Sequence, residues 1–196
     1  MDAFKISAKL FAAADTFEPA AFVPVFHKWI QQHALPDHLL IDVADYAHVP
    51  AGPGSLVVAH EANVHMDRTD GRLGVLYVRK QPFAAAATFR DRLRQTIVNT
   101  LVAADRLEQD VPGLRFRTDE VWVRVHDRLH APPGTGTFNA VRADVESVAK
   151  ELFVGRPVTL APEQDPRRLF GVTIKADGEP TTVAALLERL GATATA

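Results

Sequence analysis

Apolar and polar residues alternate along much of the chain, with a period that switches between two and about 3.6 residues. A period of two indicates a strand, and a period near 3.6 indicates a helix. The first pattern predicts strands at residues 4–13, 38–46, 55–66, 72–80, 115–129, 157–161 and 169–176. The second predicts helices at residues 24–34, 88–109, 138–153 and 182–190.

The start of the first helix is predicted from one residue. Pro24 has no amide hydrogen, so the helix should begin within a couple of residues of it, with a short turn before it. Phe26, Trp29, Ile30 and His33 follow helical spacing and should form its buried side.

The longest helix, residues 88–109, carries the strongest helical signal. Thr88 can cap it, and Asp91 stands three residues further on, as in a capping box. Its apolar stripe consists of Phe89, Leu93, Ile97, Leu101 and Ala104. Its arginines mostly fall off this stripe, which is typical of a solvated helix face; they are Arg90, Arg92, Arg94 and Arg106.

Turn-forming residues connect the early strands into an antiparallel meander. Gly52-Pro53-Gly54 follows the second strand and residues 69–71, Thr-Asp-Gly, form a hairpin signal. Residues 39–46 should pair antiparallel with residues 55–66, with Val43 and Val58 in the core. The predicted fold class is α+β, a mainly antiparallel sheet with helices packed on one face.

The order of elements repeats along the chain. Residues 1–110 and 114–177 each run strand, loop, helix, strand, turn, strand, which favours two βαββ units in a pseudo-twofold arrangement. We expect them to form a single domain, residues 1–190, followed by a frayed tail at residues 191–196.

Composition narrows the class of protein. The chain has 196 residues, of which 47% are hydrophobic and 23% charged, as a packed globular protein requires. A net charge of −2 predicts no bulk attraction to nucleic acid or to an anionic membrane. The chain contains no cysteine, shows no signal-peptide pattern and has no apolar run of membrane-spanning length. We therefore expect a soluble, cytoplasmic protein.

Several catalytic motifs are excluded by spacing. His60 and His65 are five residues apart in a strand pattern, whereas a zinc-protease helix needs two histidines four residues apart. Gly52-Pro53-Gly54 lacks the spacing and the ending of a P-loop, and no G-x-S-x-G elbow is present. No cofactor and no metal are predicted, although His48, His60 and Asp45 include the residue types of a two-histidine, one-carboxylate site.

His60 is the most conspicuous candidate. It lies in an alternating set that is otherwise apolar, formed by Leu56, Val58, Ala62 and Val64. We expect it to be mostly buried and hydrogen-bonded, either as a structural histidine or as a catalytic one.

Two functional hypotheses follow. In the first, the protein is a small-molecule enzyme with a pocket near the Gly-Pro-Gly connection. His60 or His48 would be the acid or base, Asp45 and Glu61 would orient it, and Tyr46 would donate a hydrogen bond. In the second, it is a non-catalytic binding module or homo-oligomer that associates through an exposed Trp122 and a sheet edge.

Three stretches together resemble a family of uncharacterised bacterial proteins. They are PVFHKWIQ, LLIDVADYAHVPAGPG with the His-Glu that follows it, and GVLYVRK. The resemblance runs from about Lys5 to Lys175. It implies a small bacterial cytoplasmic protein, and it implies no activity, cofactor or site residue.

Overall fold

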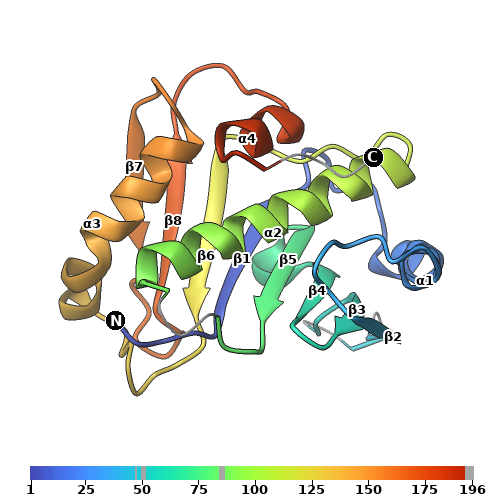
Figure 1. Ribbon diagram of the computed structural model, residues 1–196, viewed down its shortest axis with the longest axis horizontal. Coiled ribbons are helices and arrows are strands. Elements are labelled where there is room, and N and C mark those ends of the chain that lie inside the picture. Colours follow the sequence, from blue (N-terminus) through green and yellow to red (C-terminus); the bar gives the residue numbers. More distant parts are fainter. Residues whose placement is uncertain (47, 50–51, 84–86, 193–196) are drawn as a thin grey trace.

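The computed structural model describes residues 1–46, 48–49, 52–83 and 87–192. Within these residues, an antiparallel sheet of eight strands is packed against four α-helices, which confirms the α+β class (Figure 1). The strands are β1 (Ile6–Phe11), β2 (Leu40–Asp45), β3 (Ser55–Ala59), β4 (Ala62–Asp67), β5 (Gly74–Arg79), β6 (Glu120–Val125), β7 (Val158–Pro162) and β8 (Gly171–Ala176). The helices are α1 (Val23–Gln32), α2 (Phe89–Asp110), α3 (Thr135–Leu152) and α4 (Val183–Arg189), with 3-10 turns η1 (Pro19–Phe22) and η2 (Thr69–Gly71).

The strands stand in the order β2-β3-β4-β5-β1-β6-β8-β7. The first strands of the two halves, β1 and β6, pair antiparallel at the centre. On each side the last strand of a meander, β5 or β8, pairs with that central strand. The two halves therefore match in the order of their strands outward from the centre, and the first half continues with β3 and β2. An internal duplication stays a prediction.

The core lies between the sheet and the helices. Long helix α2 crosses β1 and β5, and α3 lies beside β7 at the far side of the sheet (Figure 1). Thr88 caps α2 as expected: its side chain accepts from the Asp91 amide, and the Asp91 carboxylate accepts from the Thr88 amide. The valines Val121, Val123 and Val125 of β6 are all buried in this core.

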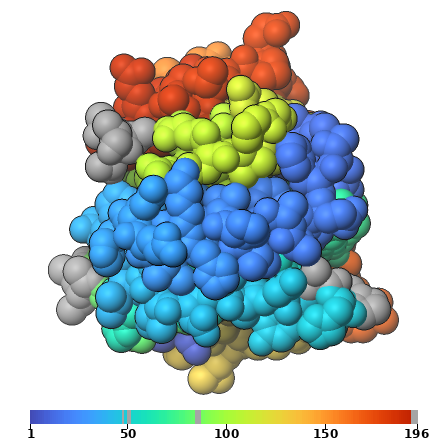
Figure 2. Space-filling model, turned by 90° about the vertical axis from the view of Figure 1, so that its right-hand side faces the viewer, coloured from blue at the N-terminus to red at the C-terminus, as the bar shows by residue number. Residues whose placement is uncertain are grey.

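Helix α1 begins at Val23, one residue before Pro24, after the η1 turn, which confirms the prediction from proline. It ends earlier than expected, because His33 takes the left-handed conformation (φ 49°) that terminates a helix. His33 is consequently exposed, and the prediction that it belongs to the buried stripe was wrong. Figure 2 shows α1 between the end of α2 and the edge strand β2.

The predicted strand 55–66 is two strands that meet in a tight hairpin at His60 and Glu61. Strand β3 pairs antiparallel with β2, as expected, but Val57 rather than Val58 is buried opposite Val43. His60 lies in the hairpin and is exposed, so the prediction that it is mostly buried was wrong. Both faces of β3 and β4 are largely covered, so apolar residues occur on both faces. The sequence pattern therefore gave no sign that the chain reverses at residues 60 and 61.

The face of the sheet away from the helices holds a buried ion pair. The Lys9 ammonium is fully buried, bonds the Asp67 carboxylate and donates to the carbonyl of Arg72 (2.9 Å). Gly74 permits this, because a Cβ there would lie 2.8 Å from Lys9 Cε and 2.3 Å from the carbonyl oxygen of Leu10. Burial lowers the pKa of Lys9, against the attraction of Asp67.

The arginines of α2 do not form a simple solvated face. Arg90 and Arg94 both bind Glu151 of α3, and Arg106 binds Asp110 within α2. Each of these three side chains is about one-third exposed or less, with Arg94 at 32%. Arg90 and Arg94 thus hold α3 beside α2.

The C-terminal residues that the structure describes are ordered against α4. The Gly191 and Ala192 amides donate to Glu188 O (2.9 Å) and Leu187 O (3.0 Å). The frayed tail at residues 191–196 stays a prediction, since residues 193–196 lie outside the described residues.

Candidate functional site

The candidate residues of the Gly-Pro-Gly hypothesis lie at opposite ends of β3. Asp45, Tyr46 and His48 are at the end where β3 begins, and His60 and Glu61 are in the hairpin that follows its last residue. A strand of five residues is about 16 Å long, too far for the two groups to share one reacting atom. The structure therefore does not bring these residues into one site.

At the first end, Tyr46 and His48 are exposed and their rings stack with centroids 6.5 Å apart. The Ser55 hydroxyl donates to the Asp45 carboxylate (3.2 Å), and the Tyr46 amide donates to Gly54 O (2.9 Å). These contacts close the connection between β2 and β3. Ala47, Pro50 and Ala51 of this connection lie outside the described residues.

At the second end, Glu61 holds the start of β2. Its carboxylate accepts from the Leu39 amide (2.9 Å). Partial burial works to raise the pKa of Glu61, but this hydrogen bond and the nearby His38 and His60 outweigh it and hold the pKa below its usual value. A carboxylate bound in this way has a clear structural role.

The geometry also decides on the exposed Trp122 and on the residue types of a two-histidine, one-carboxylate site. Trp122 is 8% exposed and is covered by the Arg124 guanidinium, 3.5 Å above its ring, so it is no exposed binding residue. Among the described residues, no three metal-ligating side chains gather into a metal site, and His48, Asp45 and His60 are divided between the ends of β3.

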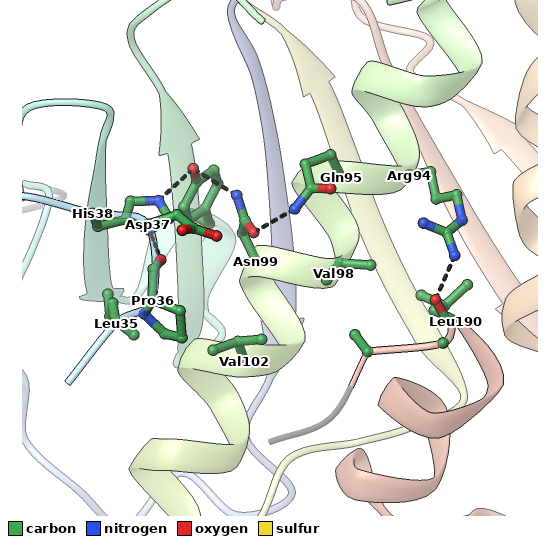
Figure 3. A pocket seen from close by; sticks show the side chains of 13 residues that line it. Leu35, Pro36, Asp37, His38, Arg94, Gln95, Val98, Asn99, Val102 and Leu190 are labelled. Carbon is green, nitrogen blue, oxygen red and sulfur yellow. Dashed lines mark hydrogen bonds between the residues drawn. The ribbon is translucent and has the colours of Figure 1, made fainter. Parts of the chain in front are cut away.

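A cavity of about 470 Å³ lies elsewhere, between α2, the loop from α1 to β2, and the chain after α4 (Figure 3). This volume is within the range of small-molecule sites. Its apolar lining comes from Leu35, Val98, Val102 and Ala192. Its polar lining comes from Asp37, His38, Tyr77, Arg94, Gln95 and Asn99.

Four of these polar side chains form one hydrogen-bonded chain along the cavity wall. His38 Nε2 lies 2.9 Å from the Tyr77 hydroxyl, and the Asn99 amide donates to the same hydroxyl (3.0 Å). The Gln95 amide donates to Asn99 Oδ1 (2.9 Å), as Figure 3 shows along α2. Tyr77 reaches this position from β5, and His38 from the loop before β2.

The Pro36 carbonyl determines the tautomer of His38. His38 Nδ1 lies 2.6 Å from this oxygen, which can only accept, so Nδ1 carries the hydrogen. In the neutral ring Nε2 is then an acceptor, and the Tyr77 hydroxyl donates to it. Burial raises the pKa of Tyr77, with Arg79 and Asn99 offsetting part of the rise, so the phenol keeps its hydrogen at neutral pH.

Charged groups stand at two sides of the cavity. Arg94 binds Glu151 and the Leu190 carbonyl, and it holds the segment after α4 in place as part of the wall. Asp37 has a left-handed backbone (φ 58°), a conformation that costs energy in most residues but that aspartate tolerates. That turn stands directly before His38.

None of these residues was among the candidates predicted from the sequence. Asn99 and Gln95 occur in α2 outside its predicted apolar stripe, and Tyr77 alternates with apolar residues like an ordinary core side chain. The one signal in the sequence was the hydroxyl of Tyr77 in an otherwise apolar strand, because a buried hydroxyl needs hydrogen-bonding partners. The partners come from three separate segments, which no local pattern connects.

No family model matches the chain, and searches of the curated proteins and of the solved structures found no match. None of the helices within the described residues is long and apolar enough to cross a membrane.

Proposed function

We propose that the protein binds a small, partly apolar organic molecule in the cavity beside Tyr77, and that Tyr77 and His38 act on it as a hydrogen-bonding and proton-transfer pair. The observation that carries this proposal is the hydrogen-bonded chain of His38, Tyr77 and Asn99 on the wall of a cavity of ligand size. The apolar part of the lining suits a hydrocarbon portion of the ligand.

The protonation of His38 sets what Tyr77 can offer. With neutral His38, the Tyr77 hydroxyl donates to Nε2, and its remaining lone pair accepts from a ligand donor. When His38 gains a proton, Nε2 donates to the Tyr77 oxygen, which frees the phenolic hydrogen to turn to a ligand acceptor such as a carbonyl. A ligand with a carbonyl group is then a target for general acid chemistry.

The experiment compares two chemically identical substitutions on α2. Gln95 is exposed and lines the cavity, so Gln95→Trp should fill the cavity from outside without disturbing the core. Gln109 is exposed on the same helix and does not line the cavity, so Gln109→Trp is the matched control. A panel of small organic acids, amides, ketones and alcohols is screened by thermal shift.

We expect ligands that raise the melting temperature of the wild type and of the Gln109 variant, but not that of the Gln95 variant. Tyr77→Phe should weaken such a ligand about tenfold, because one hydrogen bond is lost. Ligands that stabilise both tryptophan variants equally would place binding elsewhere and overturn the proposal.

A second candidate, self-association, is favoured by one observation. Large apolar side chains are exposed along β2 and its ends: Leu39 (60%), Ile41 (56%), Tyr46 (44%) and Val49 (39%). Strand β2 is also a sheet edge, although a bulge between Leu40 and Asp42 interrupts its register, as edges often show to avoid pairing. Sedimentation of the wild type and of Ile41→Lys tests self-association through β2. A wild-type dimer that the substitution dissociates supports this candidate, and a monomeric wild type contradicts it.

A further inference from the structure

The opposite edge of the sheet, β7, lies beside a groove that nothing in the described chain fills. The groove has a volume of about 650 Å³ and runs between α3 and the edge strand (Figure 1 shows both elements at one side of the molecule). Phe138 and Ala149 of α3 contribute apolar surface, and Val158 and Leu160 of β7 face the same side. A groove between a helix and a sheet edge is a geometry in which proteins receive an extended peptide strand.

The backbone of β7 offers hydrogen-bonding groups to such a strand. The Glu163 amide donates to Gly171 O (2.9 Å), and the Asp177 amide donates to Pro157 O (3.0 Å). In an antiparallel ladder, residues bonded to one neighbour alternate with residues whose groups point the other way. The amides and carbonyls of Val158 and Leu160 therefore point away from β8, and Pro162, which has no amide hydrogen, limits the free edge at its end.

The groove is positively charged. Its lining includes Arg142, Lys150 and Arg156 against a single carboxylate, that of Glu146. Glu146 pairs with Arg142 (2.7 Å). Arg156 is held by backbone carbonyls, including those of residues 176 to 178, which leave its charge uncompensated. The occupant that complements this lining is acidic.

The other half of the molecule shows the corresponding position filled. Counting outward from the central pair, β4 is the third strand on its side, as β7 is on the other. The outer side of β4 is covered by β3, an antiparallel strand that also packs against α1. The outer side of β7 has the helix, α3, but no further strand within the described residues.

We propose that β7 and α3 form a docking site for an extended, acidic segment of a partner protein, which adds antiparallel to β7 as a further strand of the sheet. Residues opposite each other in an antiparallel pair share a face. The partner residues that bond to Val158 and Leu160 therefore direct their side chains to α3, and these are the residues that should be acidic or apolar.

The probe is the peptide Thr-Glu-Thr-Val-Thr-Glu-Thr-amide with fluorescein attached to its N-terminal amine, and its binding is measured by fluorescence anisotropy. Its Glu and Val residues share one face of a strand, and its Thr residues share the other. Three relatives complete the set: one with Lys in place of Glu, one N-methylated at the Val amide and one Glu amide, and one N-methylated at two Thr amides. The peptide should bind, and the Lys peptide should bind at least about tenfold more weakly.

The two methylated peptides test the strand geometry, because charge is the same in both. Methylation at Glu and Val removes the hydrogens that bond to β7 and should abolish binding, whereas methylation at Thr should leave most of it. Lys150→Glu should weaken the parent peptide about tenfold, and Lys175→Glu, an equal charge change at an exposed position of neighbouring strand β8, should change it less than twofold.

Three results would overturn the proposal. They are the absence of binding at millimolar peptide, equal binding of the Glu and Lys peptides, and equal binding of the two methylated peptides. Sedimentation of the protein alone tests the other occupant: a dimer that Lys150→Glu dissociates and Lys175→Glu does not would assign the groove to a second copy of this chain instead.

Discussion

Acidification should destabilise the protein through His126, a half-buried histidine on the helix-free face of the sheet. Its Nε2 lies 2.8 Å from the Ser7 hydroxyl, and its amide donates to Lys5 O (2.7 Å). Burial, with the charges of Arg124, His65 and Lys5 acting in the same direction, lowers the pKa of His126 to about 4. The folded protein thus holds this imidazole neutral at pH values where the unfolded chain protonates it.

The sign and size follow from proton linkage. The unfolded state binds a proton near pH 6.5, whereas the folded state binds it only near pH 4, so the free energy of unfolding falls as the pH is lowered through this window. A difference of about 2.5 pKa units at about 1.4 kcal/mol each gives a full loss of about 3.5 kcal/mol. That is a large part of the stability of a typical domain.

Urea unfolding, followed by tryptophan fluorescence between pH 7 and pH 4, measures this loss. His126→Gln keeps a group that can bond Ser7 and cannot titrate, so it should change stability by less than about 1 kcal/mol at pH 7. At pH 4 its loss should be smaller than that of the wild type by most of the amount worked out for His126, while the loss due to other buried groups such as His65 remains. His27→Gln, the same change at an exposed position of α1, is the control and should keep the wild-type pH dependence. If the His126 variant and the control lose stability equally between pH 7 and pH 4, the reasoning is refuted.

Two further substitutions test the packing of the fold by the same urea assay. Asp67→Asn should lower the free energy of unfolding by about 3 kcal/mol, because it leaves the buried Lys9 ammonium without a counter-charge; a loss below 1 kcal/mol would show that backbone carbonyls alone suffice. Thr88→Ala should cost about 1 kcal/mol, because Thr88 accepts from the Asp91 amide at the start of α2; an unchanged midpoint would show that this cap contributes nothing.

Local features of the chain predicted most of the elements. Pro24 placed the start of α1 to within one residue, and the Thr88–Asp91 pair placed the start of α2. These predictions succeeded because a missing amide hydrogen and a capping hydroxyl act on their own helix turn, whatever the rest of the chain does. The antiparallel sheet followed from short strands joined by turns.

The hairpin at His60 shows where local pattern fails. The alternation through Leu56, Val58, Ala62 and Val64 is the same for one long strand and for two strands joined at residues 60 and 61. The reversal decides which face each residue takes, and a change of one residue moves every side chain to the other side. His60 is exposed because it lies in the turn between β3 and β4. Within β3, Val57 took the core position expected for Val58.

The sequence by itself determined the α+β class, the helices with their caps, and the residue types that exclude thiolate chemistry and several catalytic motifs. Only the tertiary structure decided the cavity, since His38, Tyr77 and Asn99 come from a loop, a strand and a helix that meet through packing. It also decided that Lys9 could be buried, because Gly74 on the neighbouring strand leaves room for its path to Asp67. Such contacts join residues far apart along the chain, so no periodicity encodes them.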